Sequence, residues 1–299
     1  MAKSLIIGGA SNYGWNELKY LVNSIKKTRF DGDICLVATN ITKETIERLV
    51  KEGVKLSLYG QEQPDGSYKA QSNGMPHVER FFYIWNTLNE LQNDYEYVIA
   101  IDTRDVVFQS NPVYWLDEKL SLGKRLVVSS EGLKYRDEPW GNNNLRETFG
   151  PYFHSKLKDN TIYNVGTIAG FAKEVTDLML LIFQLSINRP IPIVDQAVFN
   201  FLIQQEPFKS SIIFTDNKSE WAIQLGTTLE AVKSGKGDLG LMYGSDPSKH
   251  INYQMLYDDI QPRFNEGLVL DQNDNKYCIV HQYDRTLKWS NEIMEKYDD

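Results

Sequence analysis

Hydrophobic and polar positions along this chain follow two patterns. Short continuous apolar runs, typical of buried strands, end abruptly in small or polar residues, whereas longer stretches repeat apolar residues at helical spacing. The strand-like runs lie at residues 4–8, 33–38, 54–58, 97–101, 125–129, 163–171 and 277–280. The helical stretches lie at 15–25, 43–52, 78–92, 173–187 and from 195 onward. This alternation predicts an α/β fold with a mostly parallel central sheet flanked by helices.

Three stretches show neither pattern. Residues 60–77 are polar and contain Gly and Pro, and a loop of this length is more often functional than a simple connection. Residues 135–152 are rich in Asn, Pro, Gly and aromatics, which predicts a loop with at most one short helix. That composition fits a sugar site and also fits ordinary irregular surface. Residues 216–276, where Gly, Asp, Asn and Lys accumulate, predict a smaller irregular region of short strands or helices.

The run at 97–101 ends in two carboxylates, Asp102 and Asp105. Ligands of open α/β sheets bind at the carboxyl ends of the strands, so we expect both side chains in a crevice. Two close carboxylates repel each other, and Mg²⁺ or Mn²⁺ would make the pair favourable and would suit a diphosphate. In the alternative, structural interpretation, Asp102 ends the strand, Asp105 begins a turn, and Arg104 pairs with one of them.

The first strand is followed by Gly8-Gly9-Ala10-Ser11-Asn12 and then by a helix. A strand, a small-residue loop and a helix form the start of a nucleotide-binding unit, because small residues let a ligand approach the backbone. The loop has neither G-x-G-x-x-G nor a Walker A lysine, which argues against a dinucleotide or P-loop site. Tyr13 can stack on a base or pack on its neighbours. Arg80, in the first turn of helix 78–92, can contact a phosphate or base, or remain a solvated charge.

Three later positions carry further candidate chemistry. The strand with Asn164 and Gly166 has glycines in its interior, which suggests close approach of a ligand or of backbone. Asp195 and Gln196 open a helix, where the carboxylate either complements the helix dipole or faces the floor of a pocket. His281 follows the last strand and is either structural or a third partner for the two carboxylates.

Composition narrows the possible partners. The net charge is −8, from 40 acidic and 32 basic residues, so a nucleic-acid partner has no electrostatic support. A bound nucleotide would need local positive charge, which favours a metal ion nearby. The two cysteines, Cys35 and Cys278, lie in apolar runs and are expected to be buried free thiols. The apolar part of the N-terminus is too short for a signal peptide, and the sequence has no 18-residue apolar stretch. We therefore expect a cytoplasmic protein without a membrane span.

The ordered set of motifs resembles that of nucleotide-sugar-dependent glycosyltransferases of the GT-A fold, such as bacterial and large-DNA-virus glycosyltransferases. The resemblance rests on residues 99–108, on Asn164-Val165-Gly166 with Gly170, on Asp195-Gln196 and on His281. It implies one Rossmann-like GT-A domain over residues 1–299. Residues 1–110 would form the nucleotide-binding half, and residues 111–299, including the irregular 216–276, the acceptor-binding half.

The resemblance also implies roles for single residues. The acidic motif of the family is usually Asp-x-Asp with its last carboxylate on Mn²⁺. The Asp-x-x-Asp present here makes Asp105 the firmer ligand of Mn²⁺ or Mg²⁺ and leaves the role of Asp102 open. His281 is similar to the family's C-terminal histidine ligand. Contacts to the donor, expected to be a UDP-sugar, are implied for Gly9, Ala10, Ser11, Asn12, Tyr13, Arg80, Asp102, Thr103, Arg104, Asn164 and Gly166.

The implied reaction transfers a sugar to a hydroxyl of a glycan or glycoconjugate acceptor. If it inverts configuration, a carboxylate must accept the hydroxyl proton, and Asp195 is the candidate base. If it retains configuration, the Asp195-Gln196 pair resembles that of retaining enzymes, where no strong base is required. Two other classes stay open: a metal-dependent nucleotidyltransferase or phosphatase, and a non-catalytic glycan-binding protein of the same fold.

Overall fold

The computed structural model describes residues 3–91, 94–121 and 123–299, whose centre is a seven-stranded sheet. The strand order is β10-β8-β9-β6-β1-β2-β3, and all neighbours are parallel except β9, which runs antiparallel to β6 and to β8. The strands are β1 (Lys3–Ser11), β2 (Asp33–Thr39), β3 (Lys55–Leu58), β6 (Tyr95–Ile101), β8 (Leu126–Lys134), β9 (Thr161–Phe171) and β10 (Ile212–Thr215). The predicted mostly parallel α/β sheet is therefore confirmed.

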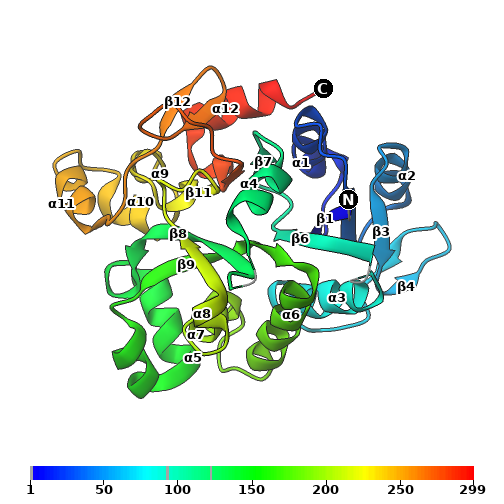
Figure 1. Cartoon of the computed structure of the whole chain (residues 1–299), viewed down its shortest axis with the longest axis horizontal. Coiled ribbons are helices and arrows are strands. Elements are labelled where there is room, and N and C mark those ends of the chain that lie inside the picture. Colours follow the sequence, from blue (N-terminus) through cyan, green and yellow to red (C-terminus); the bar gives the residue numbers. More distant parts are fainter. Residues whose placement is uncertain (1–2, 92–93, 122) are drawn as a thin grey trace.

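Helices cover both faces of this sheet (Figure 1). Side chains alternate between the two faces of a strand, so Leu5 and Ile7 of β1 contribute to one hydrophobic core and Ile6 to the other. The first core contains the buried sides of α3 (Pro76–Leu91), α6 (Ala172–Ser186) and α7 (Asp195–Leu202). The second contains those of α1 (Trp15–Lys27), α2 (Lys43–Lys51) and α4 (Pro112–Lys119). A buried layer on each side fixes the strand ends in place.

A second, three-stranded sheet joins distant parts of the chain. Its order is β11-β14-β7, formed by β11 (Ala222–Gln224), β14 (Ile279–His281) and β7 (Val106–Phe108). β14 runs antiparallel to β7 and pairs His281 with Val106. The backbone N–H of Gln282 also donates to the carbonyl oxygen of Asp105 at 2.7 Å. This register places a residue near the C-terminus beside the acidic turn that follows β6.

The remaining elements are short. Between residues 216 and 276 lie η3 (Leu225–Thr227), α9 (Leu229–Lys233), α10 (Gly237–Tyr243), α11 (Lys249–Leu256), β12 (Arg263–Asn265) and β13 (Leu268–Leu270). Elsewhere the structure has α8 (Phe208–Ser211), η4 (Tyr283–Arg285) and α12 (Leu287–Lys296). In Figure 1, α10 and α11 lie at one side of the molecule and α1–α3 at the other. Of the helices that the structure describes, none combines the length and apolar character needed to span a lipid bilayer.

The structure corrects the prediction of a loop at residues 135–152. This stretch forms η2 (Tyr135–Asp137) and the 19-residue helix α5 (Pro139–Leu157), with a kink where Gly150 has a φ of 75°. Glu138 caps the helix, because its carboxylate accepts hydrogen bonds from the backbone N–H groups of Trp140 and Gly141. Pro139 at the first helical position is favourable. Leu145 is buried in a small hydrophobic cluster with Tyr135, Leu157 and Ile162, and this tertiary packing outweighs the low helix propensity of the Asn and Gly residues.

Two smaller corrections concern segment boundaries. The first strand does not end at residue 8 but extends to Ser11, because Gly9, Ala10 and Ser11 pair with Val37, Ala38 and Thr39 of β2. The predicted loop at 60–77 contains the hairpin β4 (Gln61–Glu62) and β5 (Tyr68–Lys69) and ends where α3 begins. The last position of the predicted helix 78–92 lies outside the described residues.

Candidate active site

The acidic turn after β6 is held by hydrogen bonds to β9 and β1, the two strands that flank β6 in the central sheet. The backbone N–H of Asp102 donates to the carbonyl oxygen of Gly166 in β9 at 2.9 Å. The hydroxyl of Thr103 donates to the carbonyl oxygen of Gly9 in β1 at 2.7 Å and is buried. The chain then continues into β7. Asp102 and Asp105 are thereby fixed at the carboxyl end of β6, where the sequence placed them.

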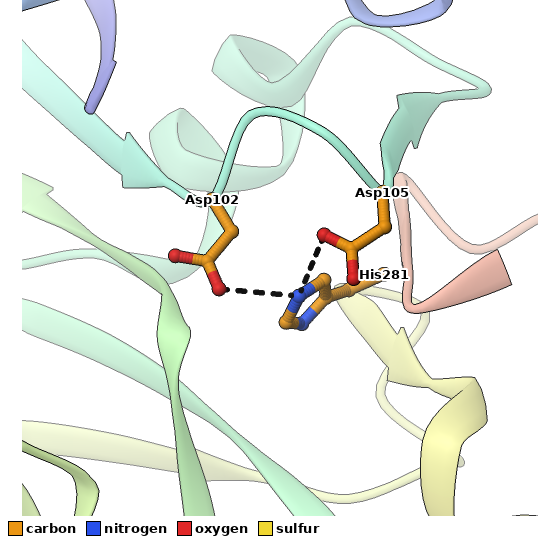
Figure 2. A group of neighbouring side chains, drawn as sticks. All are labelled: Asp102, Asp105 and His281. Atoms are coloured by element: carbon orange, nitrogen blue, oxygen red, sulfur yellow. Dashed lines mark ion pairs between the residues drawn. The ribbon is translucent and has the colours of Figure 1, made fainter. Parts of the chain in front are cut away.

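Asp102, Asp105 and His281 form a compact three-residue cluster (Figure 2). One ligand atom from each of them lies within 4.8 Å of the other two. The Nε2 atom of His281 is 3.5 Å from Oδ2 of Asp102 and 3.5 Å from Oδ1 of Asp105. Two carboxylates and an imidazole nitrogen are a donor set that Mn²⁺ accepts. The cluster therefore has the composition and spacing of a divalent-metal site.

The other ring nitrogen of His281 has a fixed partner. Nδ1 lies 2.7 Å from Oε1 of Gln224, whose Nε2 donates to the hydroxyls of Ser129 at 2.6 Å and Thr167 at 2.8 Å. Because the amide nitrogen is the donor, Oε1 accepts from Nδ1–H, and Nε2 is the ring nitrogen that faces the carboxylates. A buried oxygen that orients a histidine in this way is a usual feature of metal sites.

The charges of the cluster depend on one another. Burial by itself would lower the pKa of His281, but Asp105 and Asp102 outweigh it and raise that pKa to about 10. Burial would raise the pKa of both carboxyl groups, but Arg80 and His281 hold that of Asp102 below its usual value, and His281 does so for Asp105. In the metal-free protein a proton therefore lies between the ligands, and a cation must displace it.

Arg80 bridges two carboxylates. Its guanidinium makes an ion pair with Asp102 and a second one, at 3.1 Å, with Oδ2 of Asp195. Asp195 is 4% exposed, and burial raises its pKa in spite of Arg80. A Cβ added at Gly9 would lie 3.0 Å from Cβ of Arg80, so the glycine there allows α3 to approach β1. The sequence left open a contact of Arg80 with phosphate or base and a solvated charge, and in this structure the guanidinium contacts two carboxylates.

Two cavities meet at the cluster. The first, of about 480 Å³, is lined by Gly9, Ala10, Ser11, Asn12, Tyr13, Thr103, Arg104 and Asp105, among others. The second, of about 410 Å³, is lined by Asn164, Asp195, Gln196, Glu131, Glu138 and Trp140, among others. Arg80, Asp102 and His281 line both. Most residues selected from the sequence thus face one of two polar cavities that share a wall.

The remaining selected residues have defined positions. Gly166 lies beside the cluster, because a Cβ there would be 2.7 Å from Oδ2 of Asp102 and from Cε1 of His281. Arg104 makes ion pairs with Asp105 at 3.4 Å and with Asp284 at 3.1 Å. The pairing of Arg104 with one of the two carboxylates, expected if the acidic turn were only structural, is therefore present. Burial raises the pKa of Tyr13, which lines the first cavity.

Glu131 was missed by the sequence analysis. It lies in β8, is 5% exposed and lines the second cavity. Its Oε1 accepts hydrogen bonds from Nδ2 of Asn164 at 2.7 Å and from Nε2 of Gln196 at 3.1 Å, and burial raises its pKa. The available signal was an acidic residue two positions after the apolar run 125–129. Gln224 had no comparable signal, since it lies in the irregular region.

Comparison with known proteins supports the fold. No protein-family model and no curated protein sequence matches the chain. Among solved structures, the chain is similar to the apo structure of WbbM, a bifunctional glycosyltransferase, with a TM-score of 0.57 and 15% sequence identity. The match covers 100% of this chain and 50% of WbbM, so the chain spans half the length of that protein. At this identity the similarity shows a glycosyltransferase-like fold.

Proposed function

We propose that this chain transfers a sugar from a nucleotide-sugar, a UDP-sugar by expectation, to a hydroxyl of a glycan or glycoconjugate acceptor. One observation carries the proposal: a cluster suited to Mn²⁺ or Mg²⁺ forms the wall between two polar cavities at the carboxyl ends of β1 and β6. The glycosyltransferase-like fold supports it. The two cavities match the two substrates of such a reaction.

The first cavity is the proposed donor site. Asn12, Tyr13 and Arg104 line this cavity. In the proposal Asn12 and Tyr13 would contact the nucleoside, and Arg104 would face the diphosphate. Asp102, Asp105 and His281 would hold the cation. A bound Mn²⁺ or Mg²⁺ supplies positive charge that offsets the negative charge developing on the departing diphosphate. In the proposed division, residues 1–110 bind the nucleotide and residues 111–299 form the acceptor side.

The second cavity is the proposed acceptor site. Arg80 fixes the positions of Asp102 and Asp195, and so connects the metal ligands to the place of reaction. Asp195 is the proposed base if configuration is inverted, and its raised pKa suits that role. If configuration is retained, Asp195 and Gln196 border the reacting carbon without accepting a proton. Gln196 is oriented by its hydrogen bond to Glu131.

The test is a product assay. Purified protein is incubated with a panel of UDP- and GDP-sugars with Mn²⁺ or with a chelator, and products are identified by phosphorus NMR. We expect slow metal-dependent release of a nucleoside diphosphate from one donor. Release of sugar 1-phosphate in place of the nucleoside diphosphate would indicate nucleotidyl transfer or hydrolysis of the diphosphate instead. Intact donors in every sample would contradict the proposal and favour a non-catalytic glycan-binding protein.

A further inference from the structure

A third cavity extends the second one away from the three-residue cluster. It has a volume of about 380 Å³ and shares Trp140, Ile193 and Asp238 with the second cavity. Because the same three side chains line both spaces, the two cavities adjoin there, and we call them together the groove. Each part exceeds the roughly 300 Å³ at which ligand sites begin. The groove begins at Asp102 and His281 and continues past the N-terminal end of α5.

The walls of the third cavity suit a carbohydrate. Trp140 is 41% exposed although it is a large aromatic side chain, and it stands where the second cavity opens into the third. The amides of Asn143 and Asn144 and the carboxylate of Asp238 provide polar groups in the same wall. An aromatic face packs against the C–H face of a pyranose, while amides and carboxylates bond its hydroxyls. The segment 191–193 adds an apolar side.

One buried polar atom in this wall lacks a hydrogen-bond partner in the described part of the chain. Asn144 is 7% exposed, and among the residues that the structure describes its Oδ1 atom has no hydrogen-bond partner. A buried acceptor without a donor destabilises the unliganded protein. A ligand hydroxyl that reaches Asn144, or a small local shift of its amide when a ligand binds, would remove that cost.

The charge of the third cavity restricts the ligand further. Asp238 is its one charged lining residue within the described part of the chain. An anionic sugar would be repelled there, because the exposed carboxylate of Asp238 is negatively charged and would gain no counter-ion from it. Neutral sugars, whose hydroxyls donate to carboxylate oxygens, meet no such penalty.

We propose that the cavity beyond Trp140 is a further sugar subsite, and that the acceptor is a neutral oligosaccharide of at least two sugar units. The inference rests on the proposed glycosyl transfer. The receiving end of the glycan lies in the second cavity near Glu131 and Gln196. The next unit packs on Trp140, and the chain of sugars continues toward Asn144. A single sugar or a simple alcohol would leave the third cavity unused.

The test uses the intact protein with UDP and Mn²⁺ on an array of neutral mono- to hexasaccharides built from hexoses and N-acetylhexosamines. We expect binding to glycans of two or more units and none to monosaccharides. Trp140→Ala should weaken that binding about fivefold or more. Trp140→Phe, which keeps an aromatic face, should recover most of it. Tyr152→Ala is the matched control, because Tyr152 lies on the same helix and is 68% exposed but lines none of the three cavities described above.

The outcomes separate this inference from the proposed function. Metal-dependent UDP binding, measured by calorimetry on each variant, reports both correct folding and the donor site. Three results would overturn the subsite while UDP binding leaves the donor site intact. These are equal binding of monosaccharides and longer glycans, no binding of any glycan, or equal behaviour of Trp140→Ala and Tyr152→Ala. If neither UDP nor GDP binds the wild-type protein with metal, the proposed function fails first.

Discussion

At the scale of single residues, Gln224 decides which nitrogen of His281 faces Asp102 and Asp105. Its carbonyl oxygen accepts from Nδ1–H, while its amide nitrogen is fixed by Ser129 and Thr167. None of these groups touches the place where a cation would bind. Their effect on metal affinity must therefore act through the orientation of the imidazole ring.

We predict that Gln224→Leu lowers Mn²⁺ affinity by about 10- to 100-fold, because the ring loses its acceptor while all three ligands remain. Gln224→Glu keeps an acceptor at the same position and should stay within a few-fold of the wild type. Calorimetric Mn²⁺ titrations, with circular dichroism as a check of folding, measure both. Equal losses in the two variants would show that the site depends on packing at residue 224 and not on the hydrogen bond.

A second residue-scale prediction compares two carboxylates that contact the same arginine. Asp105 and Asp284 both make an ion pair with Arg104, but only Asp105 belongs to the three-residue cluster. Asp105→Asn should abolish metal-dependent nucleotide binding, whereas Asp284→Asn should reduce it by less than about threefold, as expected for an exposed pair. Fluorescence titration with a labelled nucleotide measures the effect. Similar losses in both variants would assign the effect to Arg104.

The role of Asp195 can be separated from that of Glu131. Both are buried carboxylates in the second cavity, but the first pairs with Arg80 and the second with amides. If Asp195 is the base of an inverting reaction, Asp195→Asn should lower kcat by about 100-fold or more at nearly unchanged donor affinity. Glu131→Gln should mainly raise the KM for the acceptor. A large loss of kcat in Glu131→Gln together with a raised acceptor KM in Asp195→Asn would instead identify Glu131 as the base.

The sequence predicted the cluster but not the contacts of Arg80. Asp102 and Asp105 were recognisable because carboxylates follow an apolar strand, and His281 because it ends another one. The bridge from Arg80 to Asp195 depends on how α3 and α7 pack on the sheet, and side-chain periodicity carries no information about such pairings. Glu131 was missed for the same reason, since its burial follows from its position between β9 and α7.

At the scale of elements, one polar network ties together the N-terminal ends of four adjacent parallel strands, opposite the site. Asp33 at the start of β2 accepts hydrogen bonds from Lys3 of β1 at 2.7 Å, Lys55 of β3 at 2.8 Å and Tyr95 of β6 at 2.6 Å. Burial would raise the pKa of Asp33, but these donors outweigh it and lower that pKa to about 2. Ionised Asp33 therefore stabilises the sheet.

We predict that Asp33→Asn lowers the free energy of unfolding by about 1–2 kcal/mol at pH 7, a value reduced for the partial exposure of both lysines. The folded pKa of about 2 lies below the unfolded value of 3.8. The difference between wild type and variant should thus be complete above about pH 4 and vanish as the pH falls through 2. Urea unfolding at several pH values measures it.

The exposed Asp31 supplies the control for this experiment, because it makes no ion pair among the described residues and lies two positions before Asp33. Asp31→Asn should leave the unfolding free energy within about 0.5 kcal/mol of the wild type. A pH-independent difference for Asp33→Asn would mean that shape, and not charge, explains the loss.

Periodicity identified the long helices and the buried strands because their apolar positions repeat. It failed for α5, whose buried face includes Gly141, Asn144 and Thr148 beside Leu145. Periodicity also predicted too early an end for β1. Gly9–Ser11 pair with β2, a segment distant in sequence, and small residues give no hydrophobic pattern that indicates this pairing. Both failures concern segments whose structure is decided by neighbours and not by their own composition.

At the scale of the whole molecule, the site exists only because the chain returns to it. β14 pairs with β7, and this brings His281 to a turn that lies 176 residues earlier in the sequence, at Asp105. The fold class followed from the order of strands and helices. The two cavities and their extension over Trp140 did not, because their shape depends on where α5, α10 and the segment 191–193 meet.

The central claim is that Asp102, Asp105 and His281 form a metal-dependent nucleotide-sugar site. Its most direct test is calorimetric titration of UDP- and GDP-sugars into the purified protein, with and without Mn²⁺. We predict that one nucleotide series binds when Mn²⁺ is present and that its binding is lost with a chelator. Failure of every nucleotide to bind in both conditions, or equal binding without metal, would contradict the account.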